Sequence, residues 1–413
     1  MQATELIHMA LGSKFIRVTK VSAKDTYFVA DVEPATRFPI CSGCYETAVN
    51  VHDRHQRQWR ELDLCGARFE LRATVRRVKC SDCGVRVELL PWADPDSQFT
   101  LGFEQQTAYL AQRCDKTSVS TTMRIAWNTV GTIIERVVRR LRKGDPLNNL
   151  THIGVDELSY RKHHEYITVV VNLLTGAIIW AHPGKNAETL TKFFTELGPA
   201  RKEKLELVAM DMSAAYIKAV KAEVPKARLV FDRFHVQRLV HDALDKVRRS
   251  EVAKWGKTSE EGKALKRTRW ALQKNTWNLT PLESGKVSLV QLANRTLYRA
   301  YMLKESLAAV LNRRQVNVAR EKLGEWISWA LRSRLEPFNK AAKTIRDHLD
   351  GILAYIQTGF SNGRTEGLNG KIRTITKRSF GFHRPESLIA LIYLCCSRID
   401  ITPAHMDPLP LGI

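Results

Sequence analysis

Short apolar runs bounded by polar residues recur between residues 151 and 250 of the chain. Runs of this kind are typical of buried strands, and we expect strands at His152–Val155, Tyr166–Leu174, Ala177–His182, Leu205–Met210 and Ala227–Phe231. Thr175 and Gly176 supply a hairpin turn between the second and third runs. A helical segment at Glu188–Leu197 precedes the fourth run and another follows it. The pattern therefore predicts the order βββ-α-β-α-β.

This order is that of the ribonuclease H fold, in which the first and fourth strands are parallel neighbours. Asp156 follows the first predicted strand and Asp211 follows the fourth, so their carboxylates would lie close together at the carboxyl ends of the strands, where ligands bind in open α/β sheets. Neighbouring carboxylates repel one another, and divalent cations with oxygen ligands relieve that repulsion. Taken alone, Asp211 fits a helix N-cap better than a metal ligand, so the metal interpretation needs further partners.

Two C-x-x-C pairs stand in the N-terminal part, which we place at residues 1–92. Cys41, Cys44, Cys80 and Cys83 provide the four thiolates that a closed tetrahedral zinc site requires. Between the pairs, apolar residues alternate with polar ones at Phe69, Leu71, Ala73 and Val75, which predicts a hairpin. Four unrelated free thiols are the alternative. The many arginines of this segment suit contact with a DNA backbone, although a charged strand face is usually only solvated.

A periodic apolar pattern follows in residues 99–143. A short helix is expected at Thr117–Ala126, and the next helix has apolar residues on one face at Val130, Ile133, Ile134, Val137, Val138 and Leu141. Asn128 and Thr129 lie at its N-terminal end, where a recognition helix presents side chains to base edges. We expect a helix-turn-helix DNA-binding domain. Its turn lacks a glycine, so a three-helix packing module is the alternative.

Basic residues follow Asp232 along a predicted helix that begins at His235. Its apolar face alternates with Arg238, Arg248 and Arg249, which we interpret as DNA contacts or a solvated face. Residues 251–355 are helix-like throughout, and we expect their tryptophans to anchor the core: Trp270, Trp277, Trp326 and Trp329. The chain would then consist of a first core part at 151–250, a helical insertion at 251–355 and a C-terminal core part at 356–413.

A third carboxylate, Glu366, lies at the start of a predicted helix in the C-terminal part. Basic residues follow it closely and could hold phosphates: Lys371, Arg373, Lys377 and Arg378. A lone glutamate in a first helical turn is more simply explained by the helix dipole. Glu366 therefore becomes a metal-ligand candidate only together with Asp156 and Asp211.

Composition narrows the class of partner. The 413 residues include 65 Lys and Arg against 43 Asp and Glu, a formal net charge of +22, which favours a polyanionic partner such as nucleic acid. No apolar run reaches the roughly 18 residues that a membrane-spanning helix needs. The N-terminus does not resemble a signal peptide, and eight cysteines are too few for a disulfide scaffold in a chain of this length.

Taken together, the motifs GVDE around Asp156, AMDMSAAY around Asp211, DRFH at 232–235, SNGRTEGLNGKIR around Glu366 and GFHRPES at 381–387 resemble the insertion-sequence transposases of the ISL-three family. The resemblance covers nearly the whole chain. It implies a multidomain α/β protein with an N-terminal zinc-binding β module, a helix-turn-helix, and a ribonuclease H-like catalytic core interrupted by an all-helical insertion.

The same resemblance implies the chemistry. Asp156, Asp211 and Glu366 would be a DDE triad that holds Mg²⁺ or Mn²⁺ for two-metal phosphoryl transfer on DNA, and Asp232 and His235 match an auxiliary signature of open role. The partners would be double-stranded transposon ends and target DNA. We expect at least a homodimer on DNA, in the bacterial cytoplasm with the nucleoid. The alternatives are an inactive DNA-binding regulator and a ribonuclease H-like nuclease that does not join strands.

Overall fold

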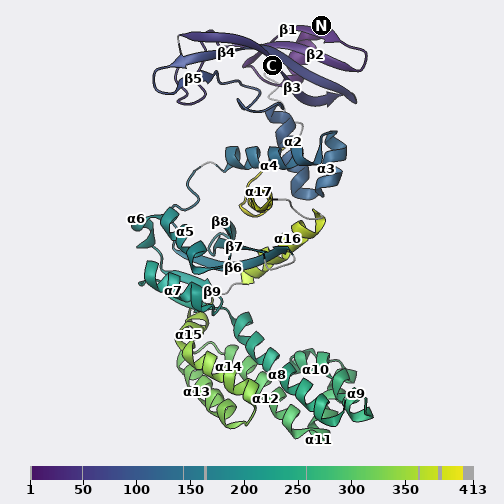
Figure 1. Cartoon of the computed structure of the whole chain (residues 1–413), viewed down its shortest axis with the longest axis vertical. Coiled ribbons are helices and arrows are strands. Elements are labelled where there is room, and N and C mark those ends of the chain that lie inside the picture. The colour runs from purple at the N-terminus through teal and green to yellow at the C-terminus, as the bar shows by residue number, and fades with distance from the viewer. Residues whose placement is uncertain are drawn as a thin grey trace. The chain divides into compact units, whose positions relative to one another are not determined.

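A computed structural model describes residues 2–48, 50–142, 144–161, 165–256, 258–360, 363–379 and 384–402, without the side chains of Arg161 and residues 363–366. The chain divides into two compact units, one formed by residues 1–144 with 375–413 and the other by residues 145–374 (Figure 1). The five-domain division expected from the sequence remains a prediction, which the two units neither replace nor confirm.

The first unit begins with α1 (Ala3–Leu11) and an antiparallel-rich sheet. Its strands are β1 (Ile16–Ala23), β2 (Tyr27–Pro34), β3 (Val51–Leu64), β4 (Ala67–Cys80) and β5 (Gly84–Val87), in the order β1-β2-β4-β3 with β5 on β4. The predicted hairpin is β3–β4, and its turn residues Cys65 and Gly66 have φ of 51° and 83°. The alternating apolar residues, including Leu71 and Val75, are fully buried and pack around Trp59.

Three short helices follow in the first unit: α2 (Leu101–Arg113), α3 (Lys116–Met123) and α4 (Trp127–Leu141). Thr100 caps α2 and Asp115 caps α3, each accepting a hydrogen bond from a backbone N–H in the first turn. The predicted apolar face of α4 is buried from Val130 to Val138. Arg124 ends α3 in the left-handed conformation, with φ 52° and ψ 47°, so an arginine occupies the position at which glycine is most common.

The second unit contains a five-stranded sheet made of β6 (His152–Arg161), β7 (Glu165–Asn172), β8 (Ala177–Pro183), β9 (Leu207–Met210) and β10 (Arg228–Phe231). The strand order is β10-β9-β6-β7-β8, and β6, β9 and β10 are parallel. The predicted neighbouring of the first and fourth strands is thus confirmed. Helices α5 (Ala187–Leu197), α6 (Pro199–Lys202) and α7 (Ala214–Glu223) connect the strands.

One strand boundary differs from the prediction. Asp156 does not follow β6 but lies inside it, because β6 continues to Arg161. The pairing with β9 stops at Gly154, whereas the antiparallel pairing with β7 continues, with Asp156 opposite Val169. The hydrogen bonds to β7 therefore keep the chain extended beyond the apolar run that predicted the strand.

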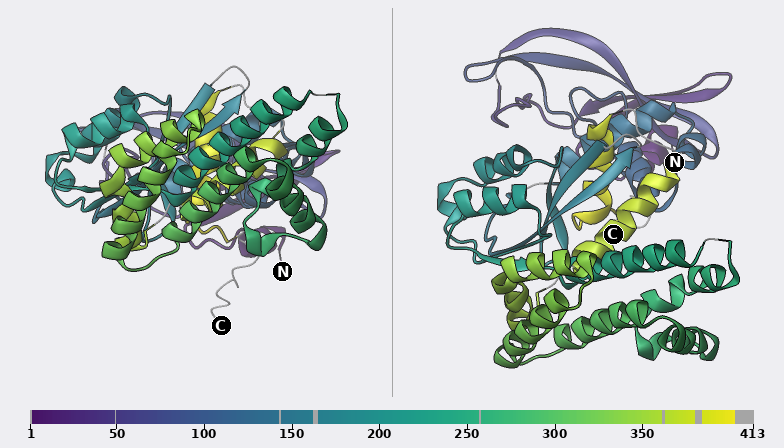
Figure 2. Two further views of the ribbon diagram at one scale, coloured as in Figure 1. Left: turned by 90° about the horizontal axis from the view of Figure 1, so that it is seen from below. Right: turned by 60° about the horizontal axis from the view of Figure 1, so that its bottom comes forward.

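The segment after β10 is helical throughout its described residues. Its elements are α8 (Arg233–Trp255), α9 (Glu260–Arg267), α10 (Arg269–Gln273), η1 (Thr276–Asn278), α11 (Pro281–Ala293), α12 (Arg295–Leu311), α13 (Val316–Arg332), α14 (Glu336–Asp347) and α15 (Leu349–Thr358). Helix α8 packs against α9, α12 and α14 (Figure 2). The expected boundary at residue 250 falls within α8. The last two helices of the described residues are α16 (Gly363–Arg378) and α17 (Pro385–Cys396), the latter packed on α4 and α2.

The expectation that the tryptophans are core anchors is wrong for three of the four. Trp326 is 2% exposed and donates a hydrogen bond to the carbonyl of Leu303. Trp270, Trp277 and Trp329 are 68%, 61% and 37% exposed. The sequence context did not separate these cases, because all four residues lie in helical or nearly helical segments with mixed polarity.

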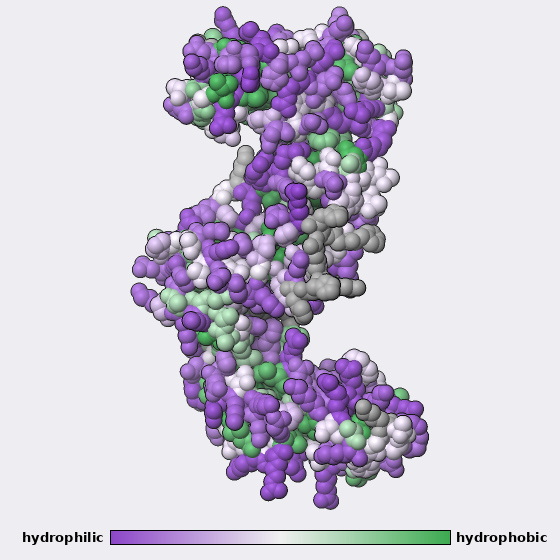
Figure 3. Space-filling model, in the orientation of Figure 1, coloured by the Kyte–Doolittle hydropathy of each residue, from purple (hydrophilic) through white to green (hydrophobic). Residues whose placement is uncertain are grey.

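Hydrophilic residues cover most of the face of the molecule in Figure 3, and hydrophobic residues form only small patches on it. Among the described residues, we find no helix with both the length and the apolar character needed to cross a membrane.

Candidate functional site

The sheet of the second unit brings Asp156 and Asp211 together. Gly154 on β6 is the register partner of Ala209 on β9. Extending this register by two residues puts Asp156 level with Asp211, which directly follows β9. Burial is the largest cause of the raised pKa of Asp156, and Asp211 is close enough for its negative charge to raise it further.

Asp232 extends this row onto the next strand. Phe231, the last residue of β10, is the register partner of Met210, the last residue of β9. Asp232 and Asp211 are therefore level, one residue beyond their strands. The backbone N–H of Asp232 donates a hydrogen bond of 3.4 Å to the carbonyl of Met210, which keeps the register at this point. Three aspartates thus form one row across β6, β9 and β10.

Asp156 has two defined hydrogen-bond donors. Its Oδ1 accepts from the backbone N–H of Glu157 at 2.7 Å, and its Oδ2 accepts from Nδ2 of Asn369 at 2.5 Å. Burial raises the pKa of Asp156, and the negative charge of Asp211 adds to this, although both hydrogen bonds oppose it. The site therefore disfavours the charge that Asp156 must carry to bind a cation, unless the cation is present.

Asp232 is 3% exposed and caps α8, because its Oδ1 accepts a hydrogen bond of 3.3 Å from the N–H of Phe234. Its Oδ2 is buried without a hydrogen-bond partner among the described residues. Burial raises the pKa of Asp232, while the charge of His235, in the first turn of α8, lowers it. A buried carboxylate oxygen without a donor is unfavourable, which makes it suited to an ion.

Asn369 was missed by the sequence analysis. It is 7% exposed, its amide contacts Asp156, and its Oδ1 has no partner among the described residues. Asn369 lies on α16, one helical turn after Glu366, so both residues are on the same face of the helix. The side chain of Glu366 itself is outside the described residues. The sequence could have pointed to Asn369, because it lies three residues after Glu366 within the motif SNGRTEGLNGKIR.

A second polar group, also missed, lies beside the aspartates. Burial raises the pKa of Glu157, and the charge of Asp211 raises it further, while a hydrogen bond with Tyr216 opposes the shift. The hydroxyl of Tyr216 also lies 2.8 Å from that of Thr168, the residue opposite Glu157 on β7. Because side chains alternate along a strand, Glu157 and Asp156 point to opposite faces of the sheet.

The basic candidates differ in exposure. Lys371, Arg373 and Lys377 are exposed on α16, and Arg238 is exposed on α8, 4.0 Å from Asp242. Arg378 donates a hydrogen bond of 2.8 Å to the carbonyl of Arg113. Arg249 has an exposed side chain that pairs with Asp245.

Arg248 does not fit the expected DNA contact. It is 7% exposed, and two of its nitrogens donate to Oδ1 of Asp245, at 3.0 and 2.7 Å. Its guanidinium is held inside the helical segment, since charged side chains are buried only when paired. The sequence shows Arg248 and Arg249 side by side and does not reveal which of them faces inward.

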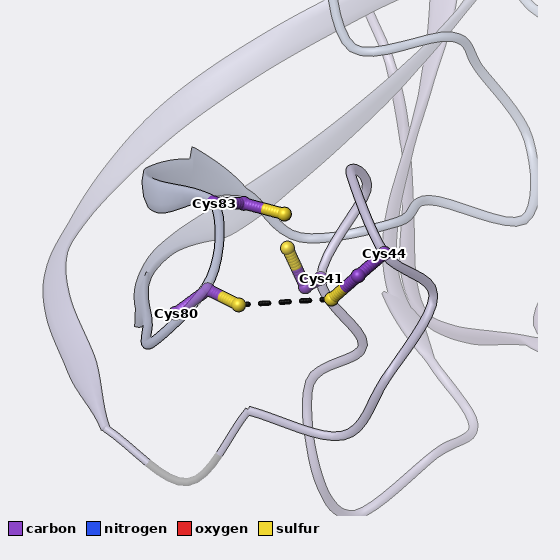
Figure 4. A group of neighbouring side chains, drawn as sticks. All are labelled: Cys41, Cys44, Cys80 and Cys83. Atoms are coloured by element: carbon purple, nitrogen blue, oxygen red, sulfur yellow. Dashed lines mark hydrogen bonds between the residues drawn. The ribbon is translucent and has the colours of Figure 1, made fainter.

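The four predicted cysteines lie together in the first unit (Figure 4). Among the described residues, they are the one group of three or more metal-ligand side chains whose donor atoms all lie within 4.8 Å of one another. Hydrogen bonds from the backbone N–H groups of Cys44 and Gly43 lower the pKa of Cys41 to about 7. A Cβ on Gly43 would lie 2.8 Å from Sγ of Cys83, so this turn requires glycine.

The two residues predicted to read base edges lie at the start of α4. Asn128 is exposed and Thr129 is half-buried in the first turn of α4. Glu104 on α2 is fully buried, and its carboxylate accepts from Arg136 at 2.7 Å and from Arg140 at 2.9 Å, both on α4. These ion pairs join α4 to α2. Because removing one partner of a buried ion pair is strongly destabilising, they hold the two helices in this arrangement.

Three family models match successive parts of the chain. The DDE family model of ISL3, described as a transposase, matches residues 153–392, more than half of the chain. The helix-turn-helix domain of transposase family ISL3 matches residues 88–138, and the zinc-finger of the transposases of IS204, IS1001, IS1096 and IS1165 matches residues 37–83. The predicted helix-turn-helix is thereby confirmed, and the cysteine cluster is that of a zinc-ribbon domain.

Two insertion-sequence transposases are similar over most of their length. The transposase for insertion sequence element IS1557 of Mycobacterium tuberculosis is 38% identical over 360 residues, which are 82% of this chain and 81% of that protein. The transposase for insertion sequence element IS1001 of Bordetella parapertussis is 27% identical over 357 residues, 86% of this chain and 88% of that protein. The chain therefore belongs to the ISL3 family and is a DNA-binding transposase.

Proposed function

We propose that this transposase cleaves DNA at the ends of its insertion sequence and joins them to target DNA, with Asp156, Asp211 and Glu366 as the ligands of divalent cations. The observation that carries the proposal is the hydrogen bond from Asn369 to Asp156. This bond supports the proposal because Asn369 follows Glu366 by one turn of α16 and its amide contacts Asp156 on β6. The sheet would then be the core of a ribonuclease H-like domain, interrupted by the helices after β10.

The surroundings of the carboxylates fit Mg²⁺ or Mn²⁺. Oxygen atoms are the ligands that these cations prefer, and two buried oxygens, Oδ2 of Asp232 and Oδ1 of Asn369, have no partner among the described residues. When bound, a pair of such ions activates the attacking oxygen and stabilises the leaving oxygen in phosphoryl transfer. Asp232 and His235 would tune the charge at the edge of this site. Burial raises the pKa of both Asp156 and Asp232, the charge of His235 lowers both, and the charge of Asp156 raises that of Asp232.

The remaining roles belong to the chain's own side chains. Asn369 orients Asp156, and the exposed Lys371 and Arg373, which follow Glu366 on α16, hold backbone phosphates near the carboxylates. In cleavage, an oxygen of water bonds to phosphorus while the bond to the 3′ oxygen breaks. In joining, the released 3′ hydroxyl attacks a target phosphodiester in the same way. No covalent bond to the protein is needed.

The first unit would select the DNA. Helix α4 would enter the major groove with Asn128 and Thr129 at base edges, and Cys41, Cys44, Cys80 and Cys83 would hold a structural Zn²⁺. Pairing of two transposon ends calls for at least a dimer on the DNA. The same activity places the protein with the bacterial nucleoid in the cytoplasm.

The test is a reaction of the purified chain with Mg²⁺ and a duplex that carries the terminal sequence of its own insertion sequence. We expect cleaved and joined products from the native chain, and binding without products from Asp211→Asn. Asp350→Asn, whose side chain is 94% exposed on α15, is the matched control and should remain active. Binding without cleavage by the native chain would identify a regulator, cleavage without joining a nuclease, and an active Asp211→Asn would refute the proposed ligands.

A further inference from the structure

A basic cavity lies among four helices of the second unit, α8, α9, α10 and α11. Its volume is about 1160 Å³, and seven of its ten described lining residues are Lys or Arg, while none of the ten is acidic. None of the seven belongs to the row of aspartates or to α16. The cavity is therefore a concentration of positive charge that neither the carboxylate site nor the helix-turn-helix explains.

Most of this charge is not neutralised within the protein. Asp245 on α8 is the partner of three guanidiniums of the lining, those of Arg248 at 2.7 Å, Arg249 at 2.8 Å and Arg269 at 3.8 Å. One carboxylate thus faces three positive charges. Burial raises the pKa of Asp245, but the hydrogen bond and charge of Arg248 and the charge of Arg249 outweigh it and lower the pKa, so this carboxylate is ionised and is already shared.

The cations on α9 and α11 increase the excess. Lys263 pairs with Glu260 at 2.9 Å on the same helix. Lys266, Arg267 and Lys286 have no ion-pair partner among the described residues, and the first two are exposed. Cations gathered on a concave surface bind anions more strongly than isolated surface cations, because their fields add.

An exposed aromatic ring completes the cavity. Trp270 on α10 is 68% exposed, and the guanidinium of Arg269 lies 4.9 Å from the centre of its ring. A ring of this size is rarely left in water, and an aromatic face beside arginines is the platform on which unpaired bases stack. Within a duplex, away from its ends, both faces of each base are covered by its neighbours, so Trp270 can stack there only on a base that has left the helix.

We propose that this cavity binds a single-stranded or locally unpaired stretch of DNA, with phosphates on Lys266, Arg267 and the exposed Arg249 of α8 and with one base stacked on Trp270. The described lining contains no Asn, Gln, Asp or Glu, and stacking on an aromatic ring together with phosphate contacts tolerates any base, so we expect little dependence on sequence. An acidic peptide would satisfy the cations but would leave the ring of Trp270 unused. The lining residues that the structure describes include none of the proposed metal ligands, Asp156, Asp211 and Glu366. The proposal therefore rests on the binding of DNA by this transposase and not on the proposed catalytic site.

The experiment measures binding of fluorescent DNA to the full chain without Mg²⁺, so the result does not depend on catalysis. The probes are a single-stranded oligonucleotide, a duplex of the same sequence and a duplex with one unpaired nucleotide. Trp270→Ala should weaken binding of the first and third probes by about 5-fold or more, from the loss of one stacked base, and should leave the plain duplex nearly unchanged. Trp270→Phe should restore most of the affinity.

Two matched controls separate this site from general effects. Trp277→Ala removes another exposed tryptophan, 61% exposed and outside the lining, and should have no effect on any probe. Lys266→Gln with Arg267→Gln should lower the salt slope for single-stranded DNA by about 1.4, whereas Arg314→Gln with Lys343→Gln, equal in charge and exposed on the same helical segment, should not. Equal losses in pocket and control variants, or an equal loss on plain duplex for Trp270→Ala, would overturn the proposal.

Discussion

Asn369 Nδ2 lies 2.5 Å from Oδ2 of Asp156 and donates a hydrogen bond to it, although 213 residues separate the two in the chain. The bond joins the central strand β6 to α16, across the whole helical segment that intervenes. Asn369 is 7% exposed, so water does not compete for the bond. The amide therefore sets the direction of one carboxylate and the position of the helix that carries Glu366.

Replacing Asn369 tests this relationship. We expect Asn369→Ala to slow DNA cleavage by about 10- to 100-fold, the usual effect of removing a residue that orients a metal ligand. Binding of transposon-end DNA should be unchanged, and a higher Mg²⁺ concentration should restore part of the rate, since the lost amide weakens ion binding. Asn317→Ala, at an exposed position of α13, is the control. A variant with native cleavage and native Mg²⁺ dependence would show that Asn369 has no part in the reaction.

The adjacency of β6 and β9 could be predicted from the sequence, because apolar runs locate strands and the order of strands determines which are neighbours. The exact extent of β6 could not. It depends on hydrogen bonds from β7, which continue after the apolar run has ended. The level position of Asp232 also needed the register of β10 on β9, and an apolar run does not contain register information when both faces are buried.

The burial of single charged or aromatic side chains was the least predictable feature. Arg248 and Arg249 are adjacent on α8, and only the structure shows that Arg248 is inside and Arg249 outside. Trp326 and Trp270 have similar surroundings in the sequence, yet their exposed fractions are 2% and 68%. Such differences arise from the packing of one helix on others. The apolar periodicity of a helix indicates its buried face but not how deeply each side chain is covered by neighbouring helices.

The aspartate row predicts a pH dependence of stability. Burial raises the pKa of Asp232, so its ionisation destabilises the fold progressively as the pH rises from the unfolded pKa, about 4, through the folded pKa. Asp232→Asn removes this penalty and keeps the helix cap. Without added divalent metal, the variant should melt at a higher temperature than the native chain at pH 7 and at the same temperature near pH 3. Saturating Mg²⁺ should reduce the difference at pH 7, and a lower melting temperature of the variant at pH 7 would contradict the argument.

The cysteine cluster predicts a structural zinc ion. Metal analysis of the native chain should give about one zinc per chain, and Cys44→Ser should lose it, because Sγ of Cys44 lies within the cluster, 3.6 Å from Sγ of Cys80. The turns at both cysteine pairs should then become sensitive to proteolysis, since metal binding and folding are coupled at such sites. Cys65→Ser is the control, because Cys65 is exposed in the β3–β4 turn. Retention of zinc by Cys44→Ser would exclude the proposed ligand set.

DNA selection by the first unit can be divided into base reading and phosphate contact. Asn128, exposed at the start of α4, is the candidate for base reading. Arg54 on β3 is also exposed and makes no ion pair with another described residue, so it is the candidate for phosphate contact. Asn128→Ala should reduce the discrimination between the native end and a mutated end by about 1–3 kcal/mol, with an unchanged salt slope. Arg54→Gln should lower the salt slope by about 0.9 and leave the discrimination unchanged. The measurement is fluorescence anisotropy of both duplexes over a range of salt concentrations. If Asn128→Ala instead weakens both duplexes equally, α4 contacts the backbone at this position, and the reading of bases must be assigned to another part of the unit.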